Sequence, residues 1–183
     1  MLRRLLLASA MVFLVCVSAA FGAQQKAKPV GRSSRAAALH YLESRLQRFE
    51  SETWYWQRLI GSPRTDTSGR RLQAMAVTDL ERTVRVWQLR DLKAHRAAQR
   101  PPHMNQWMCI HHYEGAWNDV GGPYWGGLQM SLTFQQRYGG WIYRLKGTAD
   151  HWTPLEQIWT AEKALRSRGF WPWPNTARLC GLI

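Results

Sequence analysis

Residues 107–130 concentrate the side chains that could do chemistry. One carboxylate, Glu114, ends a helical pattern and is followed by a turn rich in glycine and aromatic residues. A carboxyl group among indole and phenol rings loses hydration, which favours its protonated form near neutral pH. Because a protonated acid can donate to a glycosidic oxygen, Glu114 is the candidate catalytic acid of a site that binds sugar.

The residues after Glu114 are suited to hold a saccharide. The rings of Trp117, Tyr124 and Trp125 offer flat faces for pyranose rings. The amide of Gln129 can donate to and accept from a sugar hydroxyl or acetamido group. Ordinary packing or support of the loop is the alternative for each of these side chains.

Asp119 is the local candidate for a second carboxylate. A glycosidase that works with two carboxylates needs them about 5–9 Å apart, with the second as nucleophile or as base for water. A lone Glu114 instead fits lytic transglycosylation. In that reaction Glu114 protonates the leaving oxygen, the substrate's own N-acetyl group assists at the anomeric carbon, and Glu114 then takes the proton of a 6-hydroxyl.

The motifs around Glu114 continue to the C-terminus in a recognisable order. Glu114-Gly115 is followed by Tyr124-Trp125-Gly126-Gly127-Leu128-Gln129, then by Thr153–Ile158, Arg168–Pro174 and Cys180-Gly181. This order resembles the transglycosylase-like domain of the resuscitation-promoting factors, secreted peptidoglycan-cleaving proteins with a lysozyme-like fold. The resemblance covers residues 103–183. It implies cleavage of the bond between N-acetylmuramic acid and N-acetylglucosamine by Glu114, with Tyr124 in the cleft and no cofactor.

The chain departs from that family at two positions. The family places a cysteine directly before the glutamate, whereas Cys109 lies five residues before Glu114. The difference is about one helical turn, so the thiol can project from nearly the same face. The threonine that lines the family's cleft is assigned to Thr133.

Residues 1–23 are typical of a secretory signal, with Arg3 and Arg4 before an apolar run and small residues after it. The alternative is an uncleaved anchor, the one case in which a membrane would be a partner. Cleavage removes Cys16.

The remaining cysteines, Cys109 and Cys180, form an even pair in an oxidising compartment, so we expect a disulfide between them. A metal site built from these cysteines with His111 and His112 lacks the usual ligand spacing. We therefore expect no metal.

The net charge of +13 in 183 residues restricts the partners. In a secreted protein this charge suits anionic cell-wall polymers. It would also suit nucleic acid, but no helix-turn-helix, zinc-finger or RNA-recognition pattern accompanies it. The partners expected from charge and resemblance are peptidoglycan glycan strands and anionic wall polymers.

The rest of the chain is read as helical. A disordered basic linker is expected at residues 24–35, and apolar periodicity predicts helices at 36–60 and about 70–99. Because a short loop joins them, residues 36–100 should form an antiparallel hairpin. Trp54-Tyr55-Trp56 should lie in its core or against the next domain, and stacking on sugar is the alternative.

Residues 103–183 should form the catalytic domain. Helices are expected at 104–113, 132–138 and 154–168, the last with Thr153 as N-cap and Gly169 as its stop. Residues 118–125 are the candidate for a small β-hairpin or irregular loop.

The sequence thus predicts a mainly α protein with an N-terminal helical hairpin followed by a small lysozyme-like catalytic domain. The function expected is that of a secreted, cell-wall associated enzyme that cleaves peptidoglycan. A cell-wall glycan-binding protein without turnover is the alternative, and a basic nucleic-acid-binding protein is a third hypothesis. A steep salt dependence of DNA binding without glycan binding would favour the third.

Overall fold

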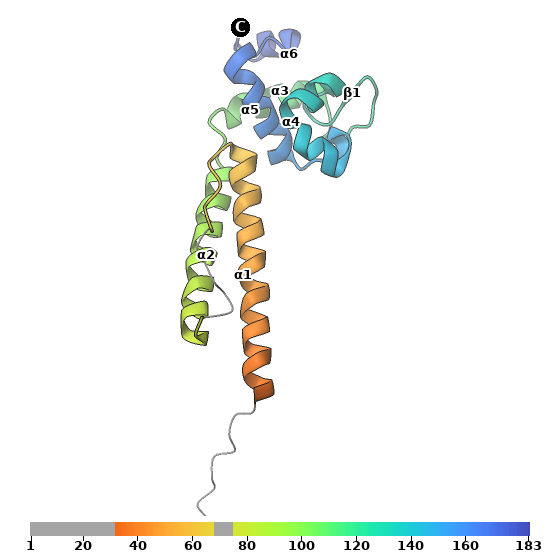
Figure 1. Ribbon diagram of the computed structural model, residues 1–183. Coiled ribbons are helices and arrows are strands. Elements are labelled where there is room, and N and C mark those ends of the chain that lie inside the picture. Colours follow the sequence, from red (N-terminus) through yellow and green to blue (C-terminus); the bar gives the residue numbers. More distant parts are fainter. Residues whose placement is uncertain (1–31, 68–74) are drawn as a thin grey trace, which may run out of the picture.

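The computed structural model describes residues 32–67 and 75–183, and it is mainly helical (Figure 1). The expected signal at 1–23 and most of the expected linker lie outside the described residues. The linker was predicted to extend to residue 35, but the first helix already begins at Arg32. No described helix has the length and hydrophobicity that a membrane crossing requires.

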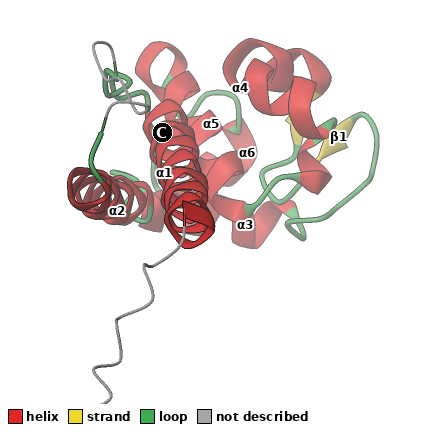
Figure 2. Ribbon diagram, turned by 60° about the horizontal axis from the view of Figure 1, so that its bottom comes forward, coloured by secondary structure: helices red, strands yellow, loops and turns green. Residues whose placement is uncertain are grey.

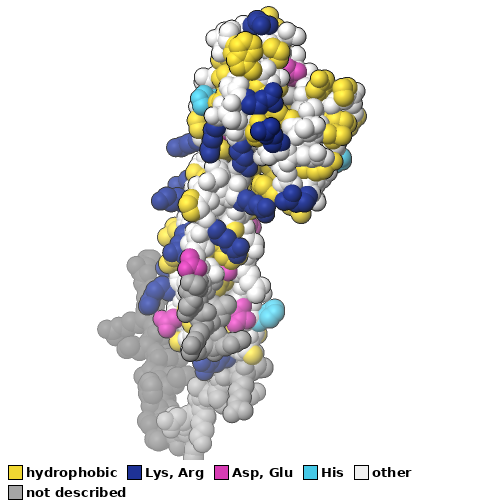
Figure 3. Space-filling view, turned by 45° about the horizontal axis from the view of Figure 1, so that its top comes forward, with side chains coloured by type: hydrophobic (Ala, Val, Ile, Leu, Met, Phe, Trp, Pro, Cys, Tyr) yellow, Lys and Arg dark blue, Asp and Glu magenta, His cyan; other side chains and the backbone are white. Residues whose placement is uncertain are grey.

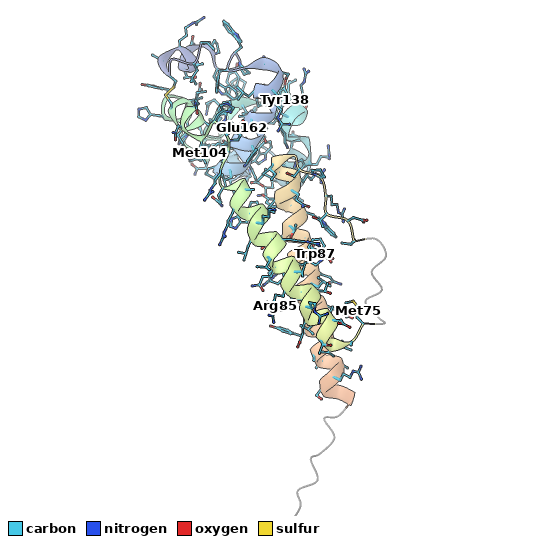
Figure 4. All side chains as sticks on the ribbon, turned by 90° about the vertical axis from the view of Figure 1, so that its left-hand side faces the viewer. Met75, Arg85, Trp87, Met104, Tyr138 and Glu162 are labelled. Atoms are coloured by element: carbon cyan, nitrogen blue, oxygen red, sulfur yellow. A yellow bond between two sulfur atoms is a disulfide. The ribbon has the colours of Figure 1, made fainter. Side chains whose placement is uncertain are left out.

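Two long helices, α1 (Arg32–Ile60) and α2 (Val77–Ala98), pack along each other and form what we call the stalk (Figures 1 and 2). Their shared core consists of aliphatic and aromatic side chains from both helices: Leu42, Leu46, Phe49, Leu80, Val84 and Trp87. Burying each of these contributes on the order of 1.5–3 kcal/mol. Trp87, labelled in Figure 4, lies midway along the stalk and makes an edge contact with Trp54 at 5.8 Å.

The stalk helices run parallel, so the predicted antiparallel hairpin is wrong. The end of α1 lies beside the end of α2, where Trp56 stacks on His95 at 4.5 Å, and Val77 packs at the other end with the cluster that contains Leu39. The described part of the connection turns back along the stalk, because Asp66 and Thr67 share a surface pocket with residues of α2. The expected start of the second helix at 70 was also too early, since Ala76 is still extended.

Both stalk helices end against the C-terminal region, residues 103–183, which we call the head. Leu59 is fully buried in the core of the head, and Trp159 Nε1 donates to the carbonyl oxygen of Ala98 at 2.7 Å. A parallel arrangement is needed for this, since only then do both helix C-termini reach the same end of the stalk. Contacts of the two helix ends with the head therefore determine the direction of α2.

The head is built from short helices around one core (Figure 2). They are α3 (Met104–Glu114), α4 (Leu132–Lys146), the 3₁₀ turn η2 (Ala149–His151), α5 (Pro154–Arg168) and α6 (Pro174–Leu179). A two-residue antiparallel pair, β1 (Tyr124–Trp125) and β2 (Met130–Ser131), aligns Tyr124 with Ser131. The hairpin thus spans residues 124–131, later than the predicted segment, whereas residues 118–123 form the irregular loop that was the other expectation.

Helix α5 has the predicted bounds because its local signals are complete. Thr153 accepts from the backbone N–H of Glu156, and the Glu156 side chain accepts from that of Thr153, which makes a capping box. Gly169 ends the helix with φ 56°. The α3 prediction is also confirmed, one residue longer than expected.

Helix α4 continues beyond the predicted end at Tyr138. Gly139 leaves helical geometry (φ −115°, ψ 17°), but the helix continues to Lys146. A Cβ on Gly139 would lie 2.5 Å from the ring of Trp152. The absence of a side chain at Gly139 therefore lets the Trp152 ring pack against the helix, although the helix was predicted to end just before this residue.

Candidate functional site

Glu114 is the last residue of α3, and its side chain is partly buried. Its carboxylate is held from a distant part of the chain: Thr176 Oγ1, on α6, donates to Glu114 Oε1 at 2.8 Å. Thr176 is itself buried, so the contact has a fixed geometry. Thr133, which the sequence analysis assigned as the cleft threonine, is exposed on the first turn of α4, and no interaction with Glu114 is recorded for it.

The disulfide explains why α6 reaches Glu114. Cys109 on α3 is bonded to Cys180, with the two Cα atoms 6.0 Å apart, so the expected bridge is confirmed. Glu114 lies a little more than one turn after Cys109, and Thr176 lies about one turn before Cys180. The bridge therefore fixes the two helices that meet at the carboxylate. It closes a loop of 71 residues, which on the chain-entropy model contributes roughly 4 kcal/mol.

Gln129 and Asp119 lie beside Gly115, the residue that follows Glu114. A Cβ on Gly115 would lie 3.4 Å from Gln129 Nε2 and 3.5 Å from Asp119 Oδ2. Gln129 Nε2 donates to Asp119 Oδ2 at 2.6 Å and to the carbonyl oxygen of Gly126 at 3.0 Å. Since both amide protons are used, the group left to meet a ligand is the acceptor, Gln129 Oε1.

The backbone at Gln129 is in the left-handed region, with φ 45°. A residue other than glycine adopts this backbone conformation only where its surroundings impose it. Here the two hydrogen bonds of Nε2 and the pairing of Trp125 with Met130 impose it. Strain at a polar residue next to a candidate acid supports a role for Gln129 in the site.

Asp119 has neighbours that fix the loop. Its Oδ1 accepts from the backbone N–H of Gly121 at 3.3 Å, its Oδ2 accepts from Gln129, and its carbonyl oxygen accepts from the N–H of Gly126. With both carboxylate oxygens engaged, Asp119 is better suited to shape the loop than to attack an anomeric carbon.

A groove of about 210 Å³ adjoins this cluster. Its lining combines the β-pair with the segment before α6: Tyr124, Gln129, Met130, Ser131, Phe134, Arg168, Pro172 and Trp173. The groove shares Gln129 with the cluster, and Trp173 lies one turn before Thr176. Tyr124 is half exposed on the groove wall, as a ring that contacts ligand should be.

The two other aromatic candidates are placed differently. Trp117 stacks on His111 with ring centroids 3.9 Å apart and packs over Gly127, where a Cβ would lie 2.7 Å from its ring. Trp125 is partly buried and pairs with Met130 in the β-pair. The groove therefore includes Tyr124 and Gln129, but neither Trp117 nor Trp125.

Sequence reasoning missed Thr176 and Arg168. Arg168 was identified as the end of a helix and the start of a motif, but not as a site residue, and it lines the groove. Thr176 could have been found from the expected disulfide, since Cys180 and Thr176 are four residues apart on a helical pattern. The described residues contain no cluster of three or more His, Cys, Asp and Glu side chains able to hold a metal.

Two other carboxylates of the head have structural partners. Glu162 accepts from Trp107 Nε1 and from the backbone N–H of His103, each at 2.9 Å. Glu156 is fully buried, and it accepts from Tyr55 Oη at 2.6 Å and from Lys146 Nζ at 2.8 Å. Glu156 and Glu162 do not line the groove next to Gln129, and neither does Glu114.

The chain matches no protein-family model, no curated protein and no solved structure.

Proposed function

We propose that this protein is a secreted, cell-wall associated enzyme that cleaves peptidoglycan, and that the head is a small lysozyme-like domain with Glu114 as its acid and base. The observation that carries the proposal is the position of Glu114 at the end of α3. There it is held by Thr176 at 2.8 Å, and Gln129, which lies beside the following Gly115, lines a groove together with Tyr124. The order of motifs that resembles the resuscitation-promoting factors supports the same assignment.

The proposed reaction is lytic transglycosylation. Glu114 gives its proton to the oxygen that links N-acetylmuramic acid to N-acetylglucosamine, and the bond from the anomeric carbon to that oxygen breaks. The substrate's acetamido group supports the anomeric carbon. Glu114 then takes the proton of the muramic 6-hydroxyl as that oxygen bonds to the anomeric carbon, so an anhydro sugar forms and no water is consumed.

The surroundings of Glu114 favour this reaction over hydrolysis. Hydrolysis with two carboxylates requires Asp119 to act on the sugar or on water, but both of its oxygens accept hydrogen bonds within the loop. Gln129 Oε1 is left to accept from a sugar hydroxyl or an acetamido N–H. Arg168 in the groove wall suits the lactyl carboxylate of muramic acid.

The test is mass spectrometry of the products after the purified protein digests peptidoglycan. We expect anhydro-muramyl ends from the wild type and from Asp119→Asn, and none from Glu114→Gln, which keeps the shape of the side chain and has no transferable proton. Reducing ends that disappear in Asp119→Asn would instead assign hydrolysis. Absence of products from the wild type would contradict the enzymatic proposal and leave a glycan-binding protein.

A further inference from the structure

A second groove lies where the stalk meets the head, and Glu114 is not among its lining residues. It has a volume of about 540 Å³, within the range typical of ligand pockets. Its lining comes from the end of α1, from the connection after it and from α4: Ser51, Trp54, Tyr55, Arg58, Ser62, Arg64, Trp141 and Leu145. We call it the junction groove. It shares no residue with the groove beside Gln129.

The connection after α1 is fixed in place on one side of the junction groove. Trp54 Nε1 donates to the carbonyl oxygen of Thr65 at 3.1 Å, and the Gln57 amide makes hydrogen bonds with both the side chain and the backbone of Thr65. These bonds position Arg64, whose guanidinium lies 3.6 Å from the centre of the Trp54 ring. Hydrogen bonds of the connection therefore hold the first arginine–tryptophan pair, Arg64 and Trp54, in place.

A second arginine–tryptophan pair also lines the groove. The guanidinium of Arg58 lies 4.7 Å from the ring centre of Trp141, and Tyr55 meets the same indole edge-on at 5.6 Å. The hydroxyl of Tyr55 donates a hydrogen bond to the Glu156 carboxylate, which holds the ring in place. Stacking on a ring restricts a guanidinium while leaving its N–H edge free to bind an anion.

The side chains that line the junction groove carry a positive charge. None of its lining residues is acidic, and the salt bridges of the described residues include neither Arg58 nor Arg64. The pKa of Lys163 is lowered, first by burial and then by the charges of Arg58 and Arg166. Lys and Arg side chains lie along the stalk and continue over the head in Figure 3.

We infer that the junction groove binds a saccharide that carries an anionic substituent, either a carboxylate or a phosphate. Indole and phenol rings pack against the apolar face of a pyranose ring. The two guanidinium groups provide paired N–H donors that match carboxylate or phosphate oxygens. Because Glu114 takes no part, this site is independent of the proposed cleavage and would place a second sugar of the wall against the stalk.

The binding test uses the full chain with Glu114→Gln, so that no substrate is turned over. N-acetylmuramic acid, N-acetylglucosamine 6-phosphate and neutral N-acetylglucosamine are titrated separately while the indole N–H signals of Trp54 and Trp141 are followed by NMR. We expect at least one of the two anionic sugars to shift both signals and the neutral sugar to bind roughly tenfold more weakly. The anionic sugar that binds identifies the substituent.

Matched variants assign the binding to the junction groove. Arg58→Gln with Arg64→Gln removes two positive charges there and should weaken binding roughly tenfold or more. Arg85→Gln with Arg96→Gln removes the same charge from exposed positions on α2 and should leave binding unchanged. If the groove pair does not fold, Arg64→Gln alone provides the comparison, since Arg64 is exposed on the connection.

Three results would overturn the inference. They are equal binding of the neutral sugar, equal loss in both double variants, and unchanged affinity when Arg58 and Arg64 are replaced. The cleavage assay of the wild type is read separately, so loss of one proposal is not confused with loss of the other.

Discussion

A single hydroxyl group decides how the Glu114 carboxylate is held. Thr176 reaches it from α6 at 2.8 Å, and the same hydroxyl lies 3.4 Å from the carbonyl oxygen of Trp173. Glu114 must give up a proton and take one back in the proposed reaction, so its orientation toward the groove affects both steps. A threonine far away in sequence is therefore a positioning residue for the acid.

Thr176→Val should lower the rate of peptidoglycan cleavage while the fold stays intact. Valine keeps the shape and removes the donor, and a hydrogen bond to a charged group contributes about 1.5–3 kcal/mol, or roughly 10- to 100-fold in rate. The measurement is the initial rate of release of soluble fragments, with thermal unfolding in parallel. Thr176→Ser restores the hydroxyl and should recover most of the rate; a serine variant as slow as valine would assign Thr176 to packing alone.

At the scale of the element, local sequence signals determine the bounds of α5, whereas tertiary contacts determine the direction of α2. The bounds of α5 follow from Thr153, Pro154 and Gly169, which lie within a turn of the positions they fix. The direction of α2 could not be predicted, because apolar periodicity identifies a buried face but says nothing about which end of a neighbouring helix it meets. Leu59 and Ala98 fix that direction through contacts with the head.

Two neighbouring glycines in α4 illustrate the same limit. Gly139 and Gly140 directly follow the predicted helix end at residue 138, but their surroundings differ. A Cβ on Gly139 would meet the Trp152 ring at 2.5 Å, whereas one on Gly140 would meet only the mobile end of Arg144 at 3.6 Å. No property of the sequence distinguishes the two positions without knowledge of where Trp152 packs.

Gly139→Ala should therefore destabilise the head by about 1–3 kcal/mol, because the buried ring has to shift. Gly140→Ala should be neutral or stabilise it by about 0.5–1 kcal/mol, because alanine lowers the entropy of the unfolded chain and favours the helix. Urea unfolding of the two variants beside the wild type measures both free energies. Equal effects of the two substitutions would contradict the packing explanation for Gly139.

At the scale of the whole molecule, a buried ionic cluster joins the stalk to the head. Glu156, on α5, accepts hydrogen bonds from Tyr55 on α1 and from Lys146 at the end of α4. Burial opposes ionisation of Glu156, but the hydrogen bonds from Lys146, Tyr55 and Thr153 outweigh it, so the pKa of Glu156 lies below its ordinary value. Burial and the Glu156 hydrogen bond raise the pKa of the Tyr55 hydroxyl, which stays protonated as the donor.

The sign of this shift predicts sensitivity to acid. A carboxyl group whose pKa is lower in the folded state contributes stability above its unfolded value, near 4.5 for glutamate, and loses that contribution as the pH falls through the folded value. Glu156→Gln should cost about 3–5 kcal/mol at pH 7, since Lys146 then loses its buried partner. The difference from the wild type should begin to shrink as the pH falls below 4.5, the unfolded value, and should be lost as the pH passes through the lower folded pKa of Glu156.

Denaturant unfolding of both proteins across this pH range tests the expectation. Glu81→Gln provides the control, because Glu81 is exposed on α2 and should change stability little at any pH. A Glu156→Gln penalty that stays constant into acid would show that the lost hydrogen bonds matter and the charge does not.

The parallel stalk also sets the distance between the start of α1 and the head. Helix α1 has 29 residues and therefore extends about 43 Å from Arg32 to the head. Both stalk helices end at the head, so Arg32 and Val77 lie toward the far end and the candidate site lies beyond the near end (Figure 1). If the chain before Arg32 were fastened to a surface, the stalk would act as a spacer. The site would then work on polymer roughly 40 Å or more from the attachment point, and shortening α1 by whole turns would reduce that reach by about 5.4 Å per turn.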